Sequence, residues 1–241
     1  MGQYLITTRP LAKPLPRSRE GCFEIINIPV TSLEPNDSFD VSEITKFSPD
    51  IAVFTSSYGV DLFFGRFNGN FSSKVSFISI GAETAKALRK WGREAIIPEK
   101  MTSEGIVDLL SKNEGKKVAL FVSSKTNGII QAYLEKKQIE HRVGILYSAE
   151  TVKGTEIVEK AMHRDCFGLI ITSSYEARAI FQKNLDKAQT KKICSEKKIF
   201  AIGKTTEMEL NNLGIPVSEP VGMSDLDKLL KEIGAKYCGD K

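Results

Sequence analysis

The sequence is poor in the residues from which metal sites, disulfide frameworks and strong acid–base pairs are built. Its 241 residues include four cysteines and two histidines. No two cysteines form a Cys-x-x-Cys pair, so neither a zinc site nor a disulfide framework is expected. The sequence has no Ser/His/Asp order, no Gly-x-Ser-x-Gly motif and no Gly-x-Gly-x-x-Gly motif. Any chemistry is therefore expected to run without a metal, a cofactor or a strong acid–base pair.

Long hydrophobic runs are also missing. No apolar run approaches the roughly 20 residues that a membrane-spanning helix needs. The segment Met1–Pro10 resembles a short strand and not the apolar core of a signal peptide. We therefore expect a cytoplasmic protein that does not bind a membrane. The net charge of +4 is small and its lysines and arginines form no continuous stripe, so no nucleic-acid partner is expected.

A long block of sequence occurs twice, beginning at Asp50 and again at Gly168. In each copy an apolar run leads into a hydroxyl-rich turn, Thr55-Ser56-Ser57 in the first and Thr172-Ser173-Ser174 in the second. A second apolar run then leads into a Gly-x-x-Thr turn, at Gly81–Thr84 and Gly203–Thr206. A duplicated pair of lobes commonly binds its ligand between them, so we expect the site in a cleft between two domains.

Short β-rich apolar runs alternate with amphipathic helical stretches along the chain. Several runs are apolar on both faces, as buried parallel strands are. This alternation is typical of α/β domains with parallel sheets. The predicted strands are Tyr4–Thr8, Glu24–Ile28, Ile51–Thr55, Ser76–Ile80, Glu94–Ile97, Val118–Val122, Arg142–Tyr147, Gly168–Thr172, Lys198–Ile202 and Ile215–Ser218.

Connection lengths predict how the domains are assembled. The joins inside each copy are long, Thr31–Pro49 and Ser148–Asp165, whereas the join between the copies, Lys112–Lys117, is short. Compact α/β units rarely need long connections, so the long joins are expected to cross between domains. We predict two flavodoxin-like parallel-sheet domains, interleaved in sequence and joined by a two-stranded connector. One domain comprises residues 1–30 and 152–241 and the other residues 46–144, with connectors at 31–45 and 145–151.

The hydroxyl and glycine turns are the candidate binding residues, because they follow strands at the edge where open α/β sheets bind ligands. Free backbone N–H groups at the following helices suit an anion. The alternative is that each turn is a plain connection whose hydroxyls cap a helix. That alternative is favoured for either turn alone, and the occurrence of equivalent turns in both copies shifts the balance towards binding. The candidates are Thr55, Ser56, Gly81, Thr84, Ser173, Ser174, Gly203, Thr205 and Thr206.

Two further residues are candidates. Arg9, in the turn after the first strand, can reach an acidic ligand, although a surface salt bridge is the simpler interpretation. Tyr147 ends the strand that enters the second connector and is expected to face the cleft. The alternative for a tyrosine at a strand end is packing with one hydrogen bond.

Taken together, these residues resemble the uroporphyrinogen-III synthase family over nearly the whole chain. The sequence departs from the family pattern at Ser57, where proline or alanine is usual after the hydroxyl turn. The resemblance depends on the order and spacing of Thr8-Arg9-Pro10, Phe54-Thr55-Ser56, Ile80-Gly81-x-x-Thr84-Ala85, Leu146-Tyr147, Thr172-Ser173-Ser174 and Ala201-Ile202-Gly203-x-Thr205-Thr206.

The resemblance implies a cofactor-free lyase of porphyrin and heme biosynthesis, with two flavodoxin-like domains around a cleft. Its substrate would be the linear hydroxymethylbilane, which the family cyclises to uroporphyrinogen III with loss of water and inversion of the terminal pyrrole ring. Tyr147 matches the family tyrosine proposed to assist the departing hydroxyl. The hydroxyls and helix N-termini would hold substrate carboxylates, and the protein would be a monomer.

The competing interpretation is a non-catalytic, bilobed tetrapyrrole-binding, anion-binding or regulatory protein. Periplasmic binding proteins and sugar-repressor cores share the two-lobe plan. The sequence has neither a signal peptide nor an evident N-terminal DNA-binding helix pair, which counts against both. A non-catalytic tetrapyrrole-binding relative stays open.

Overall fold

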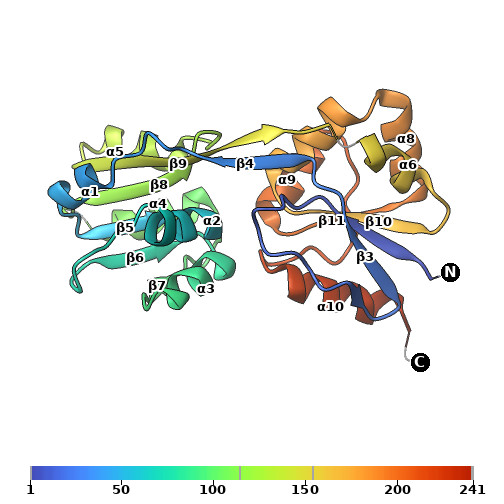
Figure 1. Cartoon of the computed structure of the whole chain (residues 1–241), viewed down its shortest axis with the longest axis horizontal. Helices are drawn as coiled ribbons and strands as arrows, with labels where there is room; N and C mark the ends of the chain where they lie inside the picture. Colours follow the sequence, from blue (N-terminus) through green and yellow to red (C-terminus); the bar gives the residue numbers. More distant parts are fainter. Residues whose placement is uncertain (1, 114, 154, 240–241) are drawn as a thin grey trace. The chain divides into compact units, whose positions relative to one another are not determined.

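The computed structural model describes residues 2–113, 115–153 and 155–239 of the chain (Figure 1). The chain divides into two compact units. Unit 1 comprises Met1–Leu33 and Glu150–Lys241, and unit 2 comprises Glu34–Ala149. Each unit is an α/β structure with its own sheet.

The sheet of unit 1 has the strand order β11-β10-β1-β3-β2. Strands β1, β3, β10 and β11 run parallel, and the short β2 is antiparallel to β3. The strands are β1 (Tyr4–Thr7), β2 (Arg19–Glu20), β3 (Phe23–Asn27), β10 (Cys166–Ile171) and β11 (Lys198–Ala201). The helices of this unit are α6 (Thr155–Met162), α7 (Ser174–Arg178), the π-helix η2 (Ala179–Asn184), α8 (Lys187–Glu196), α9 (Lys204–Asn212) and α10 (Leu226–Tyr237).

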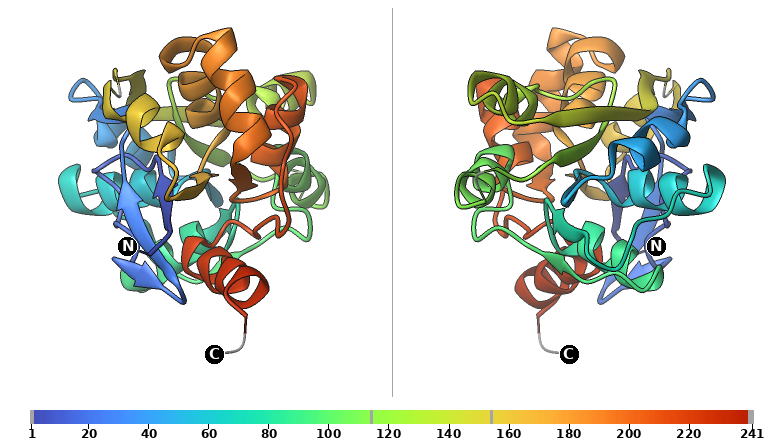
Figure 2. Two further views of the ribbon diagram at one scale, coloured as in Figure 1. Left: turned by 90° about the vertical axis from the view of Figure 1, so that its right-hand side faces the viewer. Right: turned by 90° about the vertical axis from the view of Figure 1, so that its left-hand side faces the viewer.

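Helices cover both faces of this sheet, because its strands are apolar on both sides. Ile6, Leu169 and Ile171 point into one core with residues of α6, α7, η2, α8 and α9. Leu5 and Ile170, which alternate with them, point into a second core with residues of α10. The left view of Figure 2 shows α10 on one side of the sheet and the other helices opposite.

The sheet of unit 2 has the order β4-β9-β8-β5-β6-β7, and β5 to β9 run parallel. The strands are β4 (Thr31–Pro35), β5 (Ile51–Phe54), β6 (Ser76–Ser79), β7 (Ala95–Ile96), β8 (Val118–Ser123) and β9 (His141–Thr151). The helices are α1 (Val41–Phe47), α2 (Ser57–Asp61), the π-helix η1 (Leu62–Arg66), α3 (Ala82–Lys90), α4 (Ser103–Ser111) and α5 (Ile129–Lys136).

The two faces of the unit 2 sheet are packed differently. Aliphatic side chains of β5, β6 and β8 meet those of α4 and α5 on one face. Phenylalanines gather on the other, where Phe63 of η1 stacks on Phe71 and contacts Phe54 and Phe121. Both units therefore have a packed apolar interior, which holds the strands rigidly and fixes the positions of the turns that follow them.

The strand orders show that each sheet contains strands from both copies of the repeat. In unit 1 the strands β3-β1-β10-β11 follow the flavodoxin order 2-1-3-4. In unit 2 the strands β9-β8-β5-β6-β7 follow 2-1-3-4-5 when β8 is counted first. Each sheet thus combines the strand–helix–strand segment of one copy with the block of the other. The flavodoxin-like, interleaved fold predicted from the sequence is confirmed.

The connector is formed by β4 and β9, which are neighbours in the sheet. Hydrogen bonds from Asn36 N to Leu146 O and from Val152 N to Val30 O give the pair an antiparallel register. β9 is longer than expected, because the predicted sheet strand and the second connector are one continuous strand, His141–Thr151.

One predicted strand is wrong. Ile215–Ser218 is irregular, although Ser218 N donates to Ile199 O beside β11. Pro216 has no backbone N–H and cannot contribute to a ladder of hydrogen bonds. Among the described residues, the sheet of unit 1 therefore lacks the fifth parallel strand that β7 supplies in unit 2.

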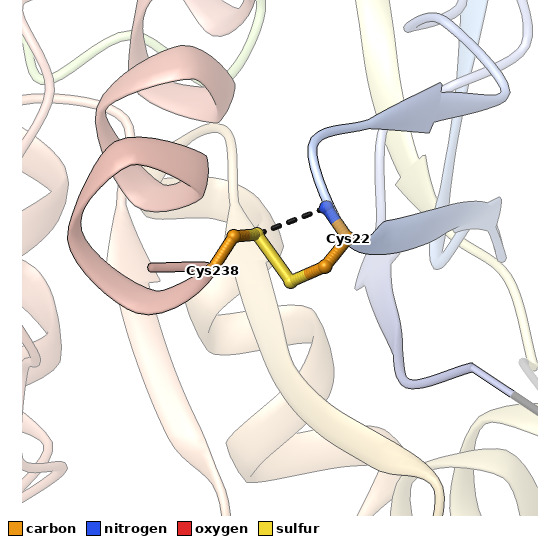
Figure 3. Close-up of a disulfide and its surroundings, with 2 residues drawn as sticks. All are labelled: Cys22 and Cys238. Carbon is orange, nitrogen blue, oxygen red and sulfur yellow. Dashed lines mark hydrogen bonds between the residues drawn. A yellow bond between two sulfur atoms is a disulfide. The ribbon is translucent and has the colours of Figure 1, made fainter. Parts of the chain in front are cut away.

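Cysteines also behave differently from the expectation. Cys22, in the β2–β3 turn, forms a disulfide with Cys238, which directly follows α10 (Figure 3). The two residues are 216 positions apart in sequence and their Cα atoms are 5.5 Å apart. The bridge ties α10 to the N-terminal hairpin. Sequence spacing could not reveal it, because α10 is brought beside β2 only by packing on the sheet.

Candidate functional site

The candidate residues lie at the carboxyl edges of the two parallel sheets. In unit 2, Thr55 follows the last residue of β5, Gly81 follows β6 after one residue, and Ser123 ends β8 opposite Tyr147 of β9. In unit 1, Thr7 ends β1 beside Asn27 of β3 and Ile170 of β10. Parallel pairing therefore brings turns that are distant in sequence to one edge of each sheet.

Tyr147 contacts the hydroxyl turn of unit 2. Its phenolic O–H donates to Ser56 Oγ at 2.9 Å. Ser56 is also the N-cap of α2, and its Oγ accepts from Gly59 N at 3.0 Å. The ring of Tyr58 packs edge-on against that of Tyr147, with 5.1 Å between the centroids. The turn thus carries a hydrogen-bonded pair of hydroxyls beside two aromatic rings.

Burial decides the protonation of this phenol. Tyr147 is 7% exposed, and its burial raises the pKa of the phenol above the ordinary 10.0. Hydrogen bonds with Ser56 and Ser123 oppose the rise only in part. The phenol therefore stays neutral and able to donate at neutral pH.

The remaining candidates of unit 2 are on neighbouring turns. Thr55 Oγ1 donates to Phe121 O at 3.0 Å, which ties the turn to β8. Ser57 Oγ donates to Glu83 Oε1 at 2.8 Å, which links the start of α2 to the first turn of α3. Gly81 is the N-cap of α3 and lacks a capping side chain, and Thr84 is buried in the same first turn.

The equivalent turn of unit 1 is occupied by a carboxylate. Glu176 is 1% exposed, and its Oε2 accepts from Thr8 Oγ1 at 2.7 Å and from Thr172 N at 3.1 Å. Its Oε1 accepts from Thr172 Oγ1 at 2.8 Å and from Ser173 Oγ at 3.1 Å. Ser173 Oγ also accepts from Glu176 N as the N-cap of α7. The hydroxyls of this turn are therefore bonded within the protein.

The Gly-x-x-Thr turn of unit 1 lies beside the same helix. Ser174 Oγ donates to Thr205 O at 3.2 Å. Thr205 is exposed, whereas Thr206 is 4% exposed, as is its counterpart Thr84. Thr206 and Thr84 thus have the same burial at equivalent places in the two copies.

Gly203 is needed for close packing, and neither Gly203 nor Gly81 has a special backbone conformation. Gly203 has an extended backbone, with φ −177°, which any residue adopts. A Cβ on Gly203 would lie 2.9 Å from Ser224 Oγ. The constraint on Gly203 is therefore the neighbouring segment around Ser224 and not the conformation of its own backbone. Gly81 has φ −172° and is also extended.

Arg9 is buried rather than at the surface, with 4% exposure. Its backbone oxygen accepts from Asn27 Nδ2 at 3.0 Å, and Thr7 Oγ1 donates to Asn27 Oδ1 at 2.6 Å. Two hydrogen bonds thus hold the turn that carries Arg9. One joins the Arg9 backbone oxygen to Asn27 of β3, and the other joins the Thr8 hydroxyl to Glu176 of α7.

Sequence reasoning missed four polar partners in these turns: Asn27, Glu83, Ser123 and Glu176. The signal for Glu176 was in the repeat, because the equivalent residue of the first copy is Gly59. Asn27 occupies the sheet position in unit 1 that Tyr147 occupies in unit 2, opposite Thr7 and Ser123 respectively. The equivalence of Asn27 and Tyr147 is visible from the strand pairing in the structure, and aligning the two short strand–helix–strand segments in sequence does not reveal it.

Two other kinds of feature are missing from the part of the chain that the structure describes. Within residues 2–113, 115–153 and 155–239, no three His, Cys, Asp or Glu side chains gather as a metal site would require. Of the helices in the same ranges, none has the length and apolar character to cross a membrane.

Comparisons with known proteins point in one direction. A family model described as uroporphyrinogen-III synthase HemD matches residues 15–231. A mutant uroporphyrinogen III synthase from the extremely thermophilic bacterium Thermus thermophilus is similar in structure, with a TM-score of 0.62, 17% identity and 87% of each chain covered. The uroporphyrinogen-III synthetase of Helicobacter pylori 26695 gives a TM-score of 0.58 and 17% identity, with 95% of this chain and 97% of that chain covered. Such identities show the fold alone. No curated protein matches the chain.

Proposed function

The chain belongs to the uroporphyrinogen-III synthase family, and from this premise we propose that it closes linear hydroxymethylbilane to uroporphyrinogen III. Membership makes it an enzyme with uroporphyrinogen-III synthase activity, in porphyrin and heme biosynthesis. The proposed reaction loses water and inverts the terminal pyrrole ring. The observation that carries this function is the family match over residues 15–231.

The polar turns suit a substrate that bears many carboxylates. Hydroxyls and the unpaired N–H groups of a helix start are donors for such groups. In unit 2 the proposed substrate contacts are Thr55, Ser56, Gly81 and Thr84. In unit 1 they are Arg9, Gly203, Thr205 and Thr206. Ser173 and Ser174, the other candidates from the sequence, already donate their hydroxyl hydrogens within the protein, to Glu176 Oε1 and Thr205 O. The expectation that the substrate lies in a cleft between the domains stays a prediction, as do the monomeric state and the cytoplasmic location.

Tyr147 supports the loss of water through Ser56. Ser56 Oγ already accepts two hydrogen bonds, from Tyr147 O–H and from Gly59 N. Both its acceptor positions are therefore used, and its own hydrogen is left to donate to a third group. Ser56 is half-buried whereas Tyr147 is buried, so Ser56 is the member of the pair that meets the substrate. A hydroxide leaving group would take a proton from Ser56, which in turn takes one from Tyr147.

The rest of the catalysis is orientation. Once water has left, the linear chain can close unaided to the symmetric isomer, so the enzyme must fix the geometry of the terminal ring and exclude water. Rigid strands with turns clamped by Glu83 and Tyr147 provide such fixed donors.

The test is incubation of the purified protein with freshly made hydroxymethylbilane and separation of the product isomers. We expect uroporphyrinogen III in excess over isomer I, without added nucleotide or metal. Isomer I alone, formed at the spontaneous rate by folded protein, would reject the enzyme and favour a tetrapyrrole-binding protein. Retention of the linear substrate on the protein without turnover would identify that second class.

A further inference from the structure

A buried negative charge occupies one of the two homologous turns and is absent from the other. Glu176 of unit 1 and Gly59 of unit 2 hold the same position after Thr-Ser-Ser-Tyr. The Glu176 carboxylate is surrounded by donors, namely Thr8 Oγ1, Thr172 N, Thr172 Oγ1 and Ser173 Oγ. Both of its oxygens therefore accept hydrogen bonds from within unit 1.

In unit 2 a neutral group takes the place of this carboxylate. A Cβ on Gly59 would lie 3.0 Å from Ser56 Oγ, so a side chain at this position would crowd the cap hydroxyl that Tyr147 contacts. The Tyr147 O–H contacts the cap hydroxyl of Ser56 just as Glu176 Oε1 contacts the cap hydroxyl of Ser173. Each turn is thus clamped by one buried group, charged in unit 1 and neutral in unit 2.

We propose that Glu176 is a positioning residue that makes the two turns unequal, so that the anionic substrate contacts the hydroxyl turn of unit 2 and its carboxylates are kept away from the homologous turn of unit 1. The inference deepens the proposed function and rests on it, because it requires an anionic substrate. A carboxylate that approached the Thr172–Ser174 turn would meet the field of Glu176 at short range. Its donors are also already bonded, whereas Ser56 has a hydrogen left to donate.

The variant Glu176→Gln tests this with little change of shape. The amide oxygen can accept from Thr8 Oγ1 and Thr172 N in place of Oε2. The amide N–H groups can donate to the hydroxyls of Thr172 and Ser173, which reverse direction. We expect KM for hydroxymethylbilane to fall by roughly three- to tenfold at low salt, from removal of one nearby charge. The difference should shrink as salt is added, with kcat nearly unchanged.

Asp186→Asn is the matched control, because it removes one carboxylate of the same unit from the N-cap of α8. It should leave KM and its salt dependence as in the wild type. Thermal unfolding on the same preparations separates folding from binding. Circular dichroism of both variants should show a folded protein.

Three outcomes decide the matter. A lower, salt-sensitive KM for Glu176→Gln alone supports the inference. An unchanged or raised KM in a folded and active variant overturns it and leaves Glu176 as a structural clamp, without touching the proposed function. If the wild-type protein forms no uroporphyrinogen III, the proposed function fails first. In that case the affinity for the linear substrate is measured directly, for the wild type and both variants over the same salt series. A salt-sensitive gain in affinity for Glu176→Gln alone would still support the inference, and its absence would overturn it.

Discussion

Ser56 and Ser173 hold homologous places, yet their hydroxyl hydrogens are used differently. Each caps a helix, α2 in unit 2 and α7 in unit 1. Ser173 donates its hydrogen to Glu176, whereas Ser56 accepts from Tyr147 and keeps its hydrogen for another partner. Duplication supplied two equal turns, and the group that packs behind each one decides whether its hydroxyl is structural or available. A capping role and a binding role are therefore alternatives that depend on the second partner.

The largest expected effect breaks the donor pair of unit 2. Tyr147→Phe and Ser56→Ala should each lower kcat by about a hundredfold, at the lower end of the range for a positioned acid. Both remove the same path for the proton, so the double variant should be hardly worse than either one. Turnover of hydroxymethylbilane measures this.

The neighbouring phenol is the control for that experiment. Tyr58→Phe removes an O–H from the ring that packs on Tyr147 and should leave kcat nearly unchanged. If Tyr147→Phe instead lost thermal stability and kept a normal rate in the folded fraction, Tyr147 would be a packing residue.

The next effect compares the two Gly-x-x-Thr turns. Thr84→Val and Thr206→Val should weaken substrate binding by about tenfold to a hundredfold, because a hydrogen bond to a charged group is worth about 1.5–3 kcal/mol. Thr84→Val should have the larger effect, since the field of Glu176 lies in unit 1. KM and the affinity for the product measure it. Thr45→Val on α1 is the control, where the hydroxyl donates to Val41 O. If both variants bound the substrate normally, Thr84 and Thr206 would have only a structural role in the first turns of their helices.

A smaller effect concerns stability. Ser173→Ala removes the cap of α7 and one donor to Glu176, so the free energy of unfolding should fall by about 1–2 kcal/mol. Its kcat should stay near that of the wild type, in contrast to Ser56→Ala. Denaturant unfolding measures the stability of Ser173→Ala, and turnover of hydroxymethylbilane on the same preparation measures its kcat for comparison with Ser56→Ala. A rate loss as large as that of Ser56→Ala would contradict the division of roles.

The smallest effect is confined to alkaline pH. Burial raises the folded-state pKa of Tyr147 above 10.0, so folding favours the neutral phenol. Its stabilising contribution is complete below the unfolded-state pKa of about 10 and is lost as pH rises through the higher folded-state value. The wild type should therefore lose stability above a pH of about 10 more steeply than Tyr147→Phe. If the free energies of unfolding of the wild type and Tyr147→Phe fell equally steeply above this pH, burial would not favour the neutral phenol.

The strand-and-turn pattern predicted which residues lie at the carboxyl edges of the sheets, and the contacts that it did not predict have a physical reason. The sequence placed Tyr147 and Ser56 at strand ends, and the structure brings them together. It did not show that Tyr147 is buried behind Ser56, because Tyr147 lies within the longer strand β9 and its side-chain neighbours come from other elements. Glu176 looks like an ordinary polar residue of a helix start until Thr8 is brought beside it, 168 positions away in sequence.

The sequence by itself determined the α/β class, the repeat and the interleaving of the domains. Apolar periodicity and connection length are local properties of the chain, so both are visible without the tertiary structure. Only the tertiary structure decided which group lies behind each hydroxyl turn, that the segment around Pro216 adds no fifth parallel strand to unit 1, and that Cys22 meets Cys238. These outcomes depend on which strands become neighbours and on the few ångströms between their side chains. Residue type at one repeat position, Glu176 against Gly59, then decided whether a carboxylate lies behind the turn, and burial kept the phenol of Tyr147 neutral.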